Sequence, residues 1–170
     1  EMRKPEVAMG DKYRVYGGLS FYQRKEIKDV IAYLRLVVNP NDEEAFRRIV
    51  NYPARGIGDT TLAKILDCAQ QQETSLWEVI SNPVQYQLPV NKGTATKLLN
   101  FRALIDGFVA QREESDALTL ARDIIEKSGI KADLATDRTA EGDSRRENLD
   151  SLISGIADFV QAQREDGQEE

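Results

Sequence analysis

The segment at residues 51–62 most constrains how this chain can fold, because it places Gly-Ile-Gly between a proline and an apolar-periodic run. Glycine adopts backbone angles that residues with a Cβ atom avoid, so Gly56 and Gly58 predict a very tight turn. Ile57, between the two glycines, is expected to pack inward as an apolar anchor. After the turn, apolar residues follow helical spacing at Ala63, Ile65, Leu66 and Ala69. The sequence therefore predicts a sharp corner that leads into a helix.

The start of that helix has the chemistry of a phosphate site. Asp59 or Thr60 could cap it, and the amides of a helix that follows bare glycine backbone point at one spot. Arg55 before the turn and Lys64 one helical turn later add positive charge. These features are typical of a helix-hairpin-helix element, which binds a nucleic-acid backbone without reading bases. The same pattern also fits a plain tight corner, in which the glycines serve only the turn geometry.

Composition limits the kind of partner that the chain can bind. The 170 residues suit one domain or one large subdomain, and a hydrophobic share of 41% is enough for a core. The formal net charge is −6, so contact with nucleic acid must come from a local patch. From position 47 to position 64 the only acid is Asp59, and the bases are Arg47, Arg48, Arg55 and Lys64. The turn is therefore a basic region of an acidic chain.

Several classes of chemistry are excluded by residue counts. The chain has no histidine and one cysteine, Cys68, so zinc sites that use histidine, Ser-His-Asp or Cys-His catalysis and internal disulfides are not expected. Cys68 lies among apolar helical positions and is expected to be buried. The acids at 133–143 lack the spacing of a calcium loop, and no metal site or catalytic residue is predicted. Apolar runs are too short to span a membrane and no signal peptide is seen, which favours a cytoplasmic location.

The periodicity along the chain predicts a mainly α fold. A short strand is expected at 13–16, followed by a helix at about 20–38 and a helix at 42–51. Further helices are expected from the turn to about residue 71 and over 76–80, 94–112, 117–127 and 144–163. An exposed loop is expected at 132–143. The last helix is expected to bury Leu149, Leu152, Ile153, Ile156 and Phe159.

Three stretches carry a resemblance to a known family. The first stretch runs from Tyr16-Gly17-Gly18 through Phe21, Arg24 and Glu26-Ile27-Lys28-Asp29 to Asn39-Pro40 and Asp42. The second consists of Asn51, Pro53, Arg55-Gly56-Ile57-Gly58 and Thr61. The third consists of Arg146 and Asn148-Leu149. In this order and spacing they resemble superfamily 1 DNA helicases of the UvrD/PcrA/Rep type. The similarity is densest over about sixty residues from Tyr16 and weaker over most of the remainder.

The resemblance implies a division of the chain and a set of site residues. Residues 1–38 would be a strand and helix from the second RecA-like motor domain (2A), 39–163 the helical 2B subdomain, and 164–170 an acidic, disordered tail. The residues expected to bind nucleic acid are Arg55, Gly56, Ile57, Gly58, Thr60, Thr61 and Lys64. The residues expected to contact the motor domain are Arg24, Glu26, Lys28 and Asp29, for which a solvated helix face is the alternative.

The resemblance also implies a function. The chain would be a subdomain of an ATP-dependent 3′–5′ DNA helicase in DNA repair or replication, binding duplex DNA or a fork junction and contacting the remaining motor domains. The alternative is a protein-interaction and autoregulatory module with little DNA affinity, for which repair proteins are possible partners. The family's phosphate loop, acidic magnesium motif and arginine-finger motif are absent from this sequence. ATP and Mg²⁺ are therefore implied for the parent only, and the chain alone is expected to be inactive as an ATPase.

Overall fold

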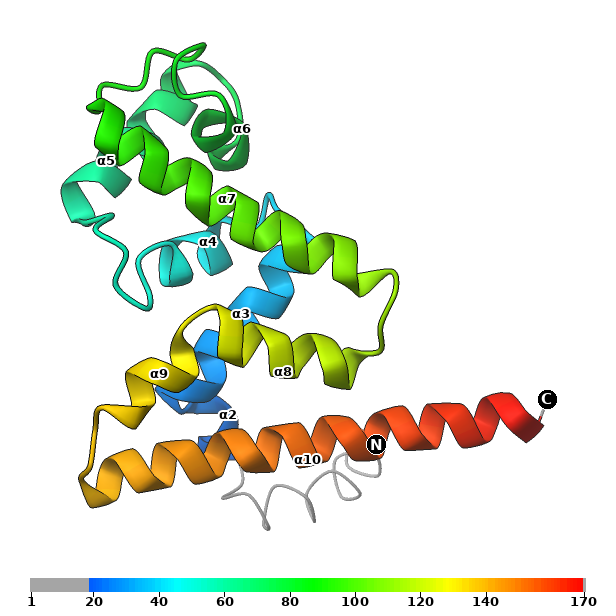
Figure 1. The fold of residues 1–170 in the computed structure, drawn as a ribbon. Helices are drawn as coiled ribbons and strands as arrows, with labels where there is room; N and C mark the ends of the chain where they lie inside the picture. Colours follow the sequence, from blue (N-terminus) through cyan, green and yellow to red (C-terminus); the bar gives the residue numbers. More distant parts are fainter. Residues whose placement is uncertain (1–18, 170) are drawn as a thin grey trace. The chain divides into compact units, whose positions relative to one another are not determined.

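The structure is a computed structural model that describes residues 19–169, and this part of the chain is helical (Figure 1). The mainly α fold that was predicted is confirmed, whereas the strand expected at 13–16 lies outside the described residues. The helices are α2 (Leu19–Gln23), α3 (Lys25–Val38), α4 (Glu43–Ile49), α5 (Asp59–Gln71), α6 (Leu76–Ser81), α7 (Lys92–Arg112), α8 (Ala117–Lys127), α9 (Ile130–Ala135) and α10 (Ala140–Glu169).

The chain forms two compact units whose boundary falls inside α3. Unit 1 joins Glu1–Ile31 to Asp116–Glu170, and unit 2 is Ala32–Ser115. The start of α3 belongs to unit 1 because its side chains bond to residues of α10 that are more than a hundred positions away. The division into 2A and 2B at residue 39 stays a prediction. Local sequence patterns do not predict pairs of residues that lie so far apart in the chain.

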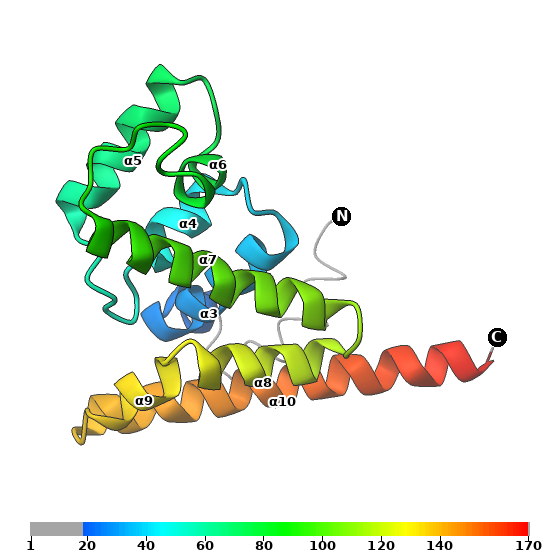
Figure 2. The same cartoon turned by 45° about the horizontal axis from the view of Figure 1, so that its top comes forward.

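Unit 2 contains the second half of α3 and helices α4 to α7. Short-range signals determine where its helices begin: the Asp42 side chain accepts a hydrogen bond from the Ala45 amide, and Ser75 and Asn91 cap α6 and α7 in the same way. Helix α6 packs against both α5 and α7, as the two ribbon views show (Figures 1 and 2). The buried core is apolar and includes Tyr33, Leu36, Phe46, Ile49, Ile57, Ile65, Cys68, Ile80, Leu98, Phe101, Ile105 and Phe108.

Unit 1 contains α2, the first half of α3, and α8 to α10. Helix α10 packs against α8 and α9, and the core includes Phe21, Ile27, Val30, Leu120, Ala121, Ile124, Ile130, Leu134, Leu149 and Leu152. The loop expected at 132–143 is wrong at both ends, since α9 extends to Ala135 and α10 begins at Ala140. Ile130 and Leu134 are four residues apart and both buried, but the charged residues between them hide this short apolar stripe.

The last helix is longer than predicted and less buried. Leu149 and Leu152 are buried as expected, but Phe159 is 58% exposed. The tail expected to be disordered is helical up to Glu169, because α10 continues without a break. Near its end, the Arg164 guanidinium donates to the Asp116 carboxylate at 2.7 Å, which ties this segment to the start of α8.

Candidate functional site

The Gly-Ile-Gly turn lies in unit 2 between α4 and α5, and its two glycines differ in conformation. Gly56 has φ +79°, in the left-handed region that favours glycine. Gly58 has φ −81° and ψ −177°, which any residue can adopt. The Ile57 side chain is 1% exposed, so the inward anchor is confirmed. The turn therefore needs glycine for its backbone at position 56 only.

An asparagine side chain holds the turn in shape. The Asn51 Oδ1 atom accepts hydrogen bonds from the Arg55 amide at 2.7 Å and from the Ile57 amide at 3.0 Å. One side-chain oxygen thus replaces the backbone acceptors that these two amides would have in regular structure. Its effect is to draw the segment before Gly58 into a closed loop.

The start of α5 differs from the expected cap. Gly58 occupies the N-cap position, and no side chain caps the helix, so the expectation that Asp59 or Thr60 would do so is wrong. Asp59 instead lies in the first turn of the helix. Gly58, Asp59 and Thr60 are exposed, and Thr61 is half-buried. The first amides of α5 therefore lie at the surface without a side-chain acceptor.

Arg55 turns inward rather than toward solvent. Its Nη1 atom donates to the carbonyl oxygens of Ile49 at 2.8 Å and Tyr52 at 3.0 Å, with a longer contact to Val50 at 3.4 Å. Its Nη2 atom donates to the Tyr33 hydroxyl. The guanidinium carbon also lies 5.8 Å from the centre of the Tyr33 ring and 5.1 Å from that of Phe101. The structure thus places this predicted phosphate ligand among α3, α4 and α7.

Two lysines are exposed near the turn, and the sequence pattern pointed to only one of them. Lys64 lies on α5 and is exposed, as the predicted site requires. Lys97 lies on α7 and is also exposed. A Cβ atom built on Gly56 would lie 2.7 Å from the Lys97 Nζ atom, so this ammonium group covers the face of Gly56. No sequence signal links the two positions, which belong to different helices.

Alanine at the two glycines should affect folding differently. We expect Gly56→Ala to lower the free energy of unfolding by about 1–2 kcal/mol, because alanine is strained at positive φ and its Cβ would displace Lys97. Gly58→Ala should lower it by less, about 0.5–1 kcal/mol, because nothing lies within 4 Å of the added Cβ and only the preference of the N-cap position for glycine over alanine is lost. Urea unfolding followed by circular dichroism measures both. Equal destabilisation by the two substitutions would contradict the assignment.

The residues expected to contact the motor domain belong to unit 1, where two of them are already buried. Glu26 is 2% exposed, and its Oε2 atom accepts from Arg24 Nε at 2.8 Å and from Asn148 Nδ2 at 2.9 Å. Burial alone would raise the pKa of the Glu26 carboxyl, but the hydrogen bonds from Asn148 and Arg24 outweigh it and hold the pKa below its ordinary value. Arg24 also donates to Glu141 on α10 at 2.7 Å.

The other two residues predicted to contact the motor domain also differ in burial. Asp29 is also 2% exposed and accepts from Lys25 at 2.7 Å, whereas Lys28 is exposed. The helix expected from residue 20 is interrupted at Arg24, the residue whose side chain reaches α10. Of the four residues, only Lys28 and part of Arg24 present side chains at the surface of the described structure.

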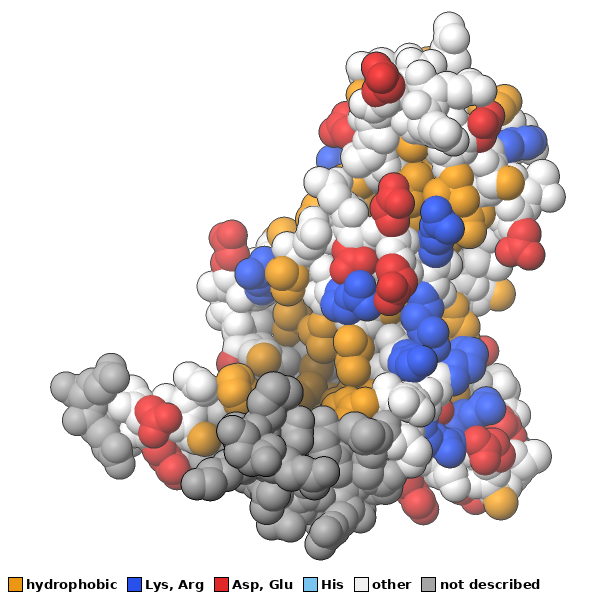
Figure 3. Space-filling view, turned by 180° about the vertical axis from the view of Figure 1, so that it is seen from behind, with side chains coloured by type: hydrophobic (Ala, Val, Ile, Leu, Met, Phe, Trp, Pro, Cys, Tyr) orange, Lys and Arg blue, Asp and Glu red, His pale blue; other side chains and the backbone are white. Residues whose placement is uncertain are grey.

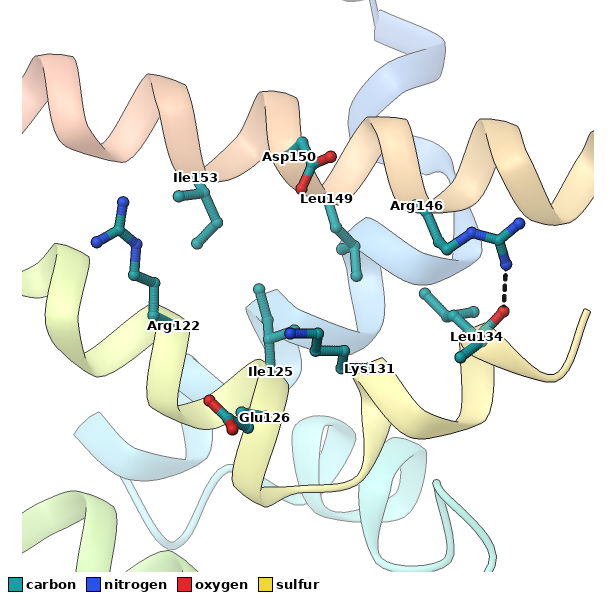
Figure 4. Close-up of a pocket in the computed structure, with 10 residues that line it drawn as sticks. Arg122, Ile125, Glu126, Lys131, Leu134, Arg146, Leu149, Asp150 and Ile153 are labelled. Atoms are coloured by element: carbon teal, nitrogen blue, oxygen red, sulfur yellow. Dashed lines mark hydrogen bonds between the residues drawn. The ribbon is translucent and has the colours of Figure 1, made fainter.

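A cavity in unit 1 contains none of the predicted site residues. It has a volume of about 570 Å³ and lies among α8, α9 and α10 (Figure 4). Its apolar lining includes Ile125, Leu134, Leu149 and Ile153, and its charged lining includes Arg122, Glu126, Lys131 and Asp150. Arg146 donates to the Leu134 carbonyl at one end, as the dashed line in Figure 4 marks. The charged groups include both signs, so the cavity favours neither an anion nor a cation.

The described residues offer neither a metal-binding cluster nor a membrane-spanning helix. Within residues 19–169, no group of three His, Cys, Asp or Glu side chains could hold a metal ion. Over the same range, no helix has the length and apolar character needed to cross a membrane. Cys68 is buried as predicted, and burial raises the pKa of its thiol.

Comparison with known proteins gives the chain a family. Residues 10–170 match the family described as UvrD-like helicase C-terminal domain. The chain is 38% identical over 152 residues to the ATP-dependent DNA helicase PcrA of Bacillus subtilis, which covers 89% of the chain and 20% of that protein. It is 35% identical to DNA helicase II of Salmonella typhimurium over 147 residues, and 34% identical to DNA helicase II of Escherichia coli over the same length.

In each of these two DNA helicase II proteins, the aligned region covers 86% of the chain and 20% of the relative. The chain therefore spans about a fifth of the length of the relatives that it matches. The resemblance seen in the sequence motifs is confirmed, and the chain belongs to the UvrD-like helicase C-terminal domain family.

Proposed function

We propose that this chain is the duplex-DNA-binding and regulatory 2B subdomain, with part of the 2A motor domain, of an ATP-dependent 3′–5′ DNA helicase acting in DNA repair or replication. The observation that carries the proposal is the exposed start of α5 after the Gly-Ile-Gly turn. Its first amides have no side-chain cap, and the turn lies in a chain of the helicase family. An uncapped helix start next to lysines favours a phosphate oxygen.

The proposed contact is to the DNA backbone. The amides from Gly58 to Thr60 would donate to phosphate oxygens, with Thr61 beside them and the exposed Lys64 nearby. Phosphate contacts carry no sequence information, so binding would be independent of sequence. Positive and negative side chains are interspersed over the face seen in Figure 3, in agreement with the net charge of −6. We therefore expect weak binding by the isolated chain that depends steeply on salt concentration.

The rest of the parent protein would supply the motor. The relatives named above are helicases about five times as long as the aligned region, so ATP, Mg²⁺ and the remaining motor domains are assigned to parts outside this chain. Arg24 and Lys28, with Glu26 and Asp29 bracing their helix, would face those motor domains. DNA-stimulated release of phosphate from ATP by the 170-residue chain alone would contradict this assignment.

The test is fluorescence anisotropy of a labelled duplex–single-strand junction titrated with the 170-residue chain at low and moderate salt. We expect binding that weakens as salt is raised. Gly58→Asp should reduce the affinity at least tenfold, because a carboxylate would stand where a phosphate must approach. Its backbone angles suit aspartate and the position is open, so folding should be kept.

The matched control is Gly107→Asp on α7. Gly107 is also exposed, also has open space around it, and lies in the same unit. This variant has the same added charge and should bind as the unchanged chain does. Absence of binding at low salt, or equal losses in the two variants, would refute the proposal. Either result would favour the alternative of a protein-interaction and autoregulatory module.

A further inference from the structure

We propose that two cations at the Gly-Ile-Gly turn, Arg55 and Lys97, have different roles. In this assignment Arg55 positions the turn, and Lys97, which reaches across from α7, is the cation that meets the phosphate. The inference rests on the proposed function, because it assigns the charges of the same DNA site. It replaces the expectation that Arg55 itself binds phosphate.

The contacts of Arg55 identify it as a positioning residue. Its guanidinium donates to the carbonyl oxygens of Ile49 and Tyr52 at 2.8 and 3.0 Å, at and just beyond the end of α4, where the helix dipole favours a cation. It also donates to the Tyr33 hydroxyl and lies against the Phe101 ring. To reach a phosphate, the side chain would have to give up these hydrogen bonds and its contacts with the Tyr33 and Phe101 rings. These hydrogen bonds and the ring contact join α3, α4 and α7 to the loop that leads into the turn.

Lys97 has the opposite character. It is exposed, and among the described residues its ammonium group has no ion pair or hydrogen bond. Its Nζ, Cε and Cδ atoms lie over Gly56, at 2.7, 3.2 and 3.3 Å from the position of a Cβ atom there. A lysine ammonium is a compact charge on a flexible stem, with three donors that suit a single phosphate oxygen. It therefore adds charge at the turn without being needed to shape it.

Salt dependence separates the two roles. Each phosphate that a cation neutralises contributes about 0.9 to the slope of log affinity against log salt concentration. Lys97→Gln should therefore reduce that slope by about one and weaken binding about three- to tenfold at low salt. Arg55→Gln should leave the slope unchanged. Its effect should appear instead as shifted or broadened amide NMR signals from Gly56 to Thr60 in the free chain, which Lys97→Gln should leave in place.

The experiment uses the labelled junction at four or more salt concentrations, with Lys131→Gln as the matched control. Lys131 is an exposed lysine of unit 1, whereas the turn belongs to unit 2, and its loss should leave the slope unchanged. The inference is overturned if Lys97→Gln behaves as Lys131→Gln does, or if the slope falls in Arg55→Gln and not in Lys97→Gln. If Arg55→Gln does not fold, Arg55→Lys keeps the charge and tests the same hydrogen bonds, and the Lys97 comparison is unaffected.

The two proposals fail in different ways. If the unchanged chain does not bind the junction, or Gly58→Asp binds as Gly107→Asp does, the proposed function fails and the inference fails with it. If Gly58→Asp alone abolishes binding while Lys97→Gln matches the Lys131 control, only the assignment of Lys97 is wrong. Slopes and NMR signals that follow the expected pattern support both.

Discussion

Phe101→Ala is expected to lower the free energy of unfolding by about 3–5 kcal/mol, because it opens a cavity at the centre of unit 2. The Phe101 side chain is 1% exposed. Its ring meets Phe46 and Trp77 edge to face, with centroids 6.0 and 6.4 Å away, contacts that add to the value of burial alone. It also supports the Arg55 guanidinium at 5.1 Å. The substitution should therefore loosen both the core and the loop before the turn.

Urea unfolding followed by circular dichroism and by Trp77 fluorescence measures this effect. The control is Leu99→Ala on the same helix, because Leu99 is 41% exposed and should lose about 1 kcal/mol or less. The amide NMR signals from Gly56 to Thr60 should shift in Phe101→Ala and not in the control. A loss for Phe101→Ala no larger than that for Leu99→Ala would show that this ring is not central to the core.

Glu26→Ala is expected to lower the free energy of unfolding by about 2–4 kcal/mol, because it leaves hydrogen-bonding groups of Arg24 and Asn148 without their buried acceptor. The carboxylate joins the start of α3 to α10 within unit 1. Glu44→Ala is the control, since Glu44 also pairs with an arginine but its side chain is 83% exposed, and it should lose about 0.5 kcal/mol or less. Unfolding in urea at neutral pH compares them, and equal small losses would contradict the expected role.

The pH dependence of a second substitution at the same residue, Glu26→Gln, gives another measure. The pKa of Glu26 is lower in the folded chain than its ordinary value of 4.5, so the unfolded chain binds the proton more readily. The stabilisation is therefore complete above the ordinary value and is lost as pH falls through the lower, folded-state pKa. The difference in unfolding free energy between the unchanged chain and Glu26→Gln should shrink when the comparison is moved from pH 7 to below pH 4. A difference that stays constant would refute this linkage.

The sequence alone predicted the features that depend on near neighbours. The helix at 117–127 matches α8, Asp42 caps α4, and Ile57 is buried between its glycines. Helical periodicity and caps act over three or four residues, so they can be read locally. The family motifs were equally local, and the membership that they implied is confirmed. Where local signals were weak, as in α9 or at the uncapped start of α5, the prediction was wrong.

Only the tertiary structure decided which side chains meet. An arginine next to a glycine turn reads as an exposed cation, but packing of α3 and α7 gives Arg55 a set of carbonyls and rings to bind instead. Lys97 reaches Gly56 from another helix, and Glu26 finds Asn148 at a separation of 122 residues. These pairings follow from how helices pack against one another, and side-chain partners set by packing leave no periodic pattern in the residues themselves.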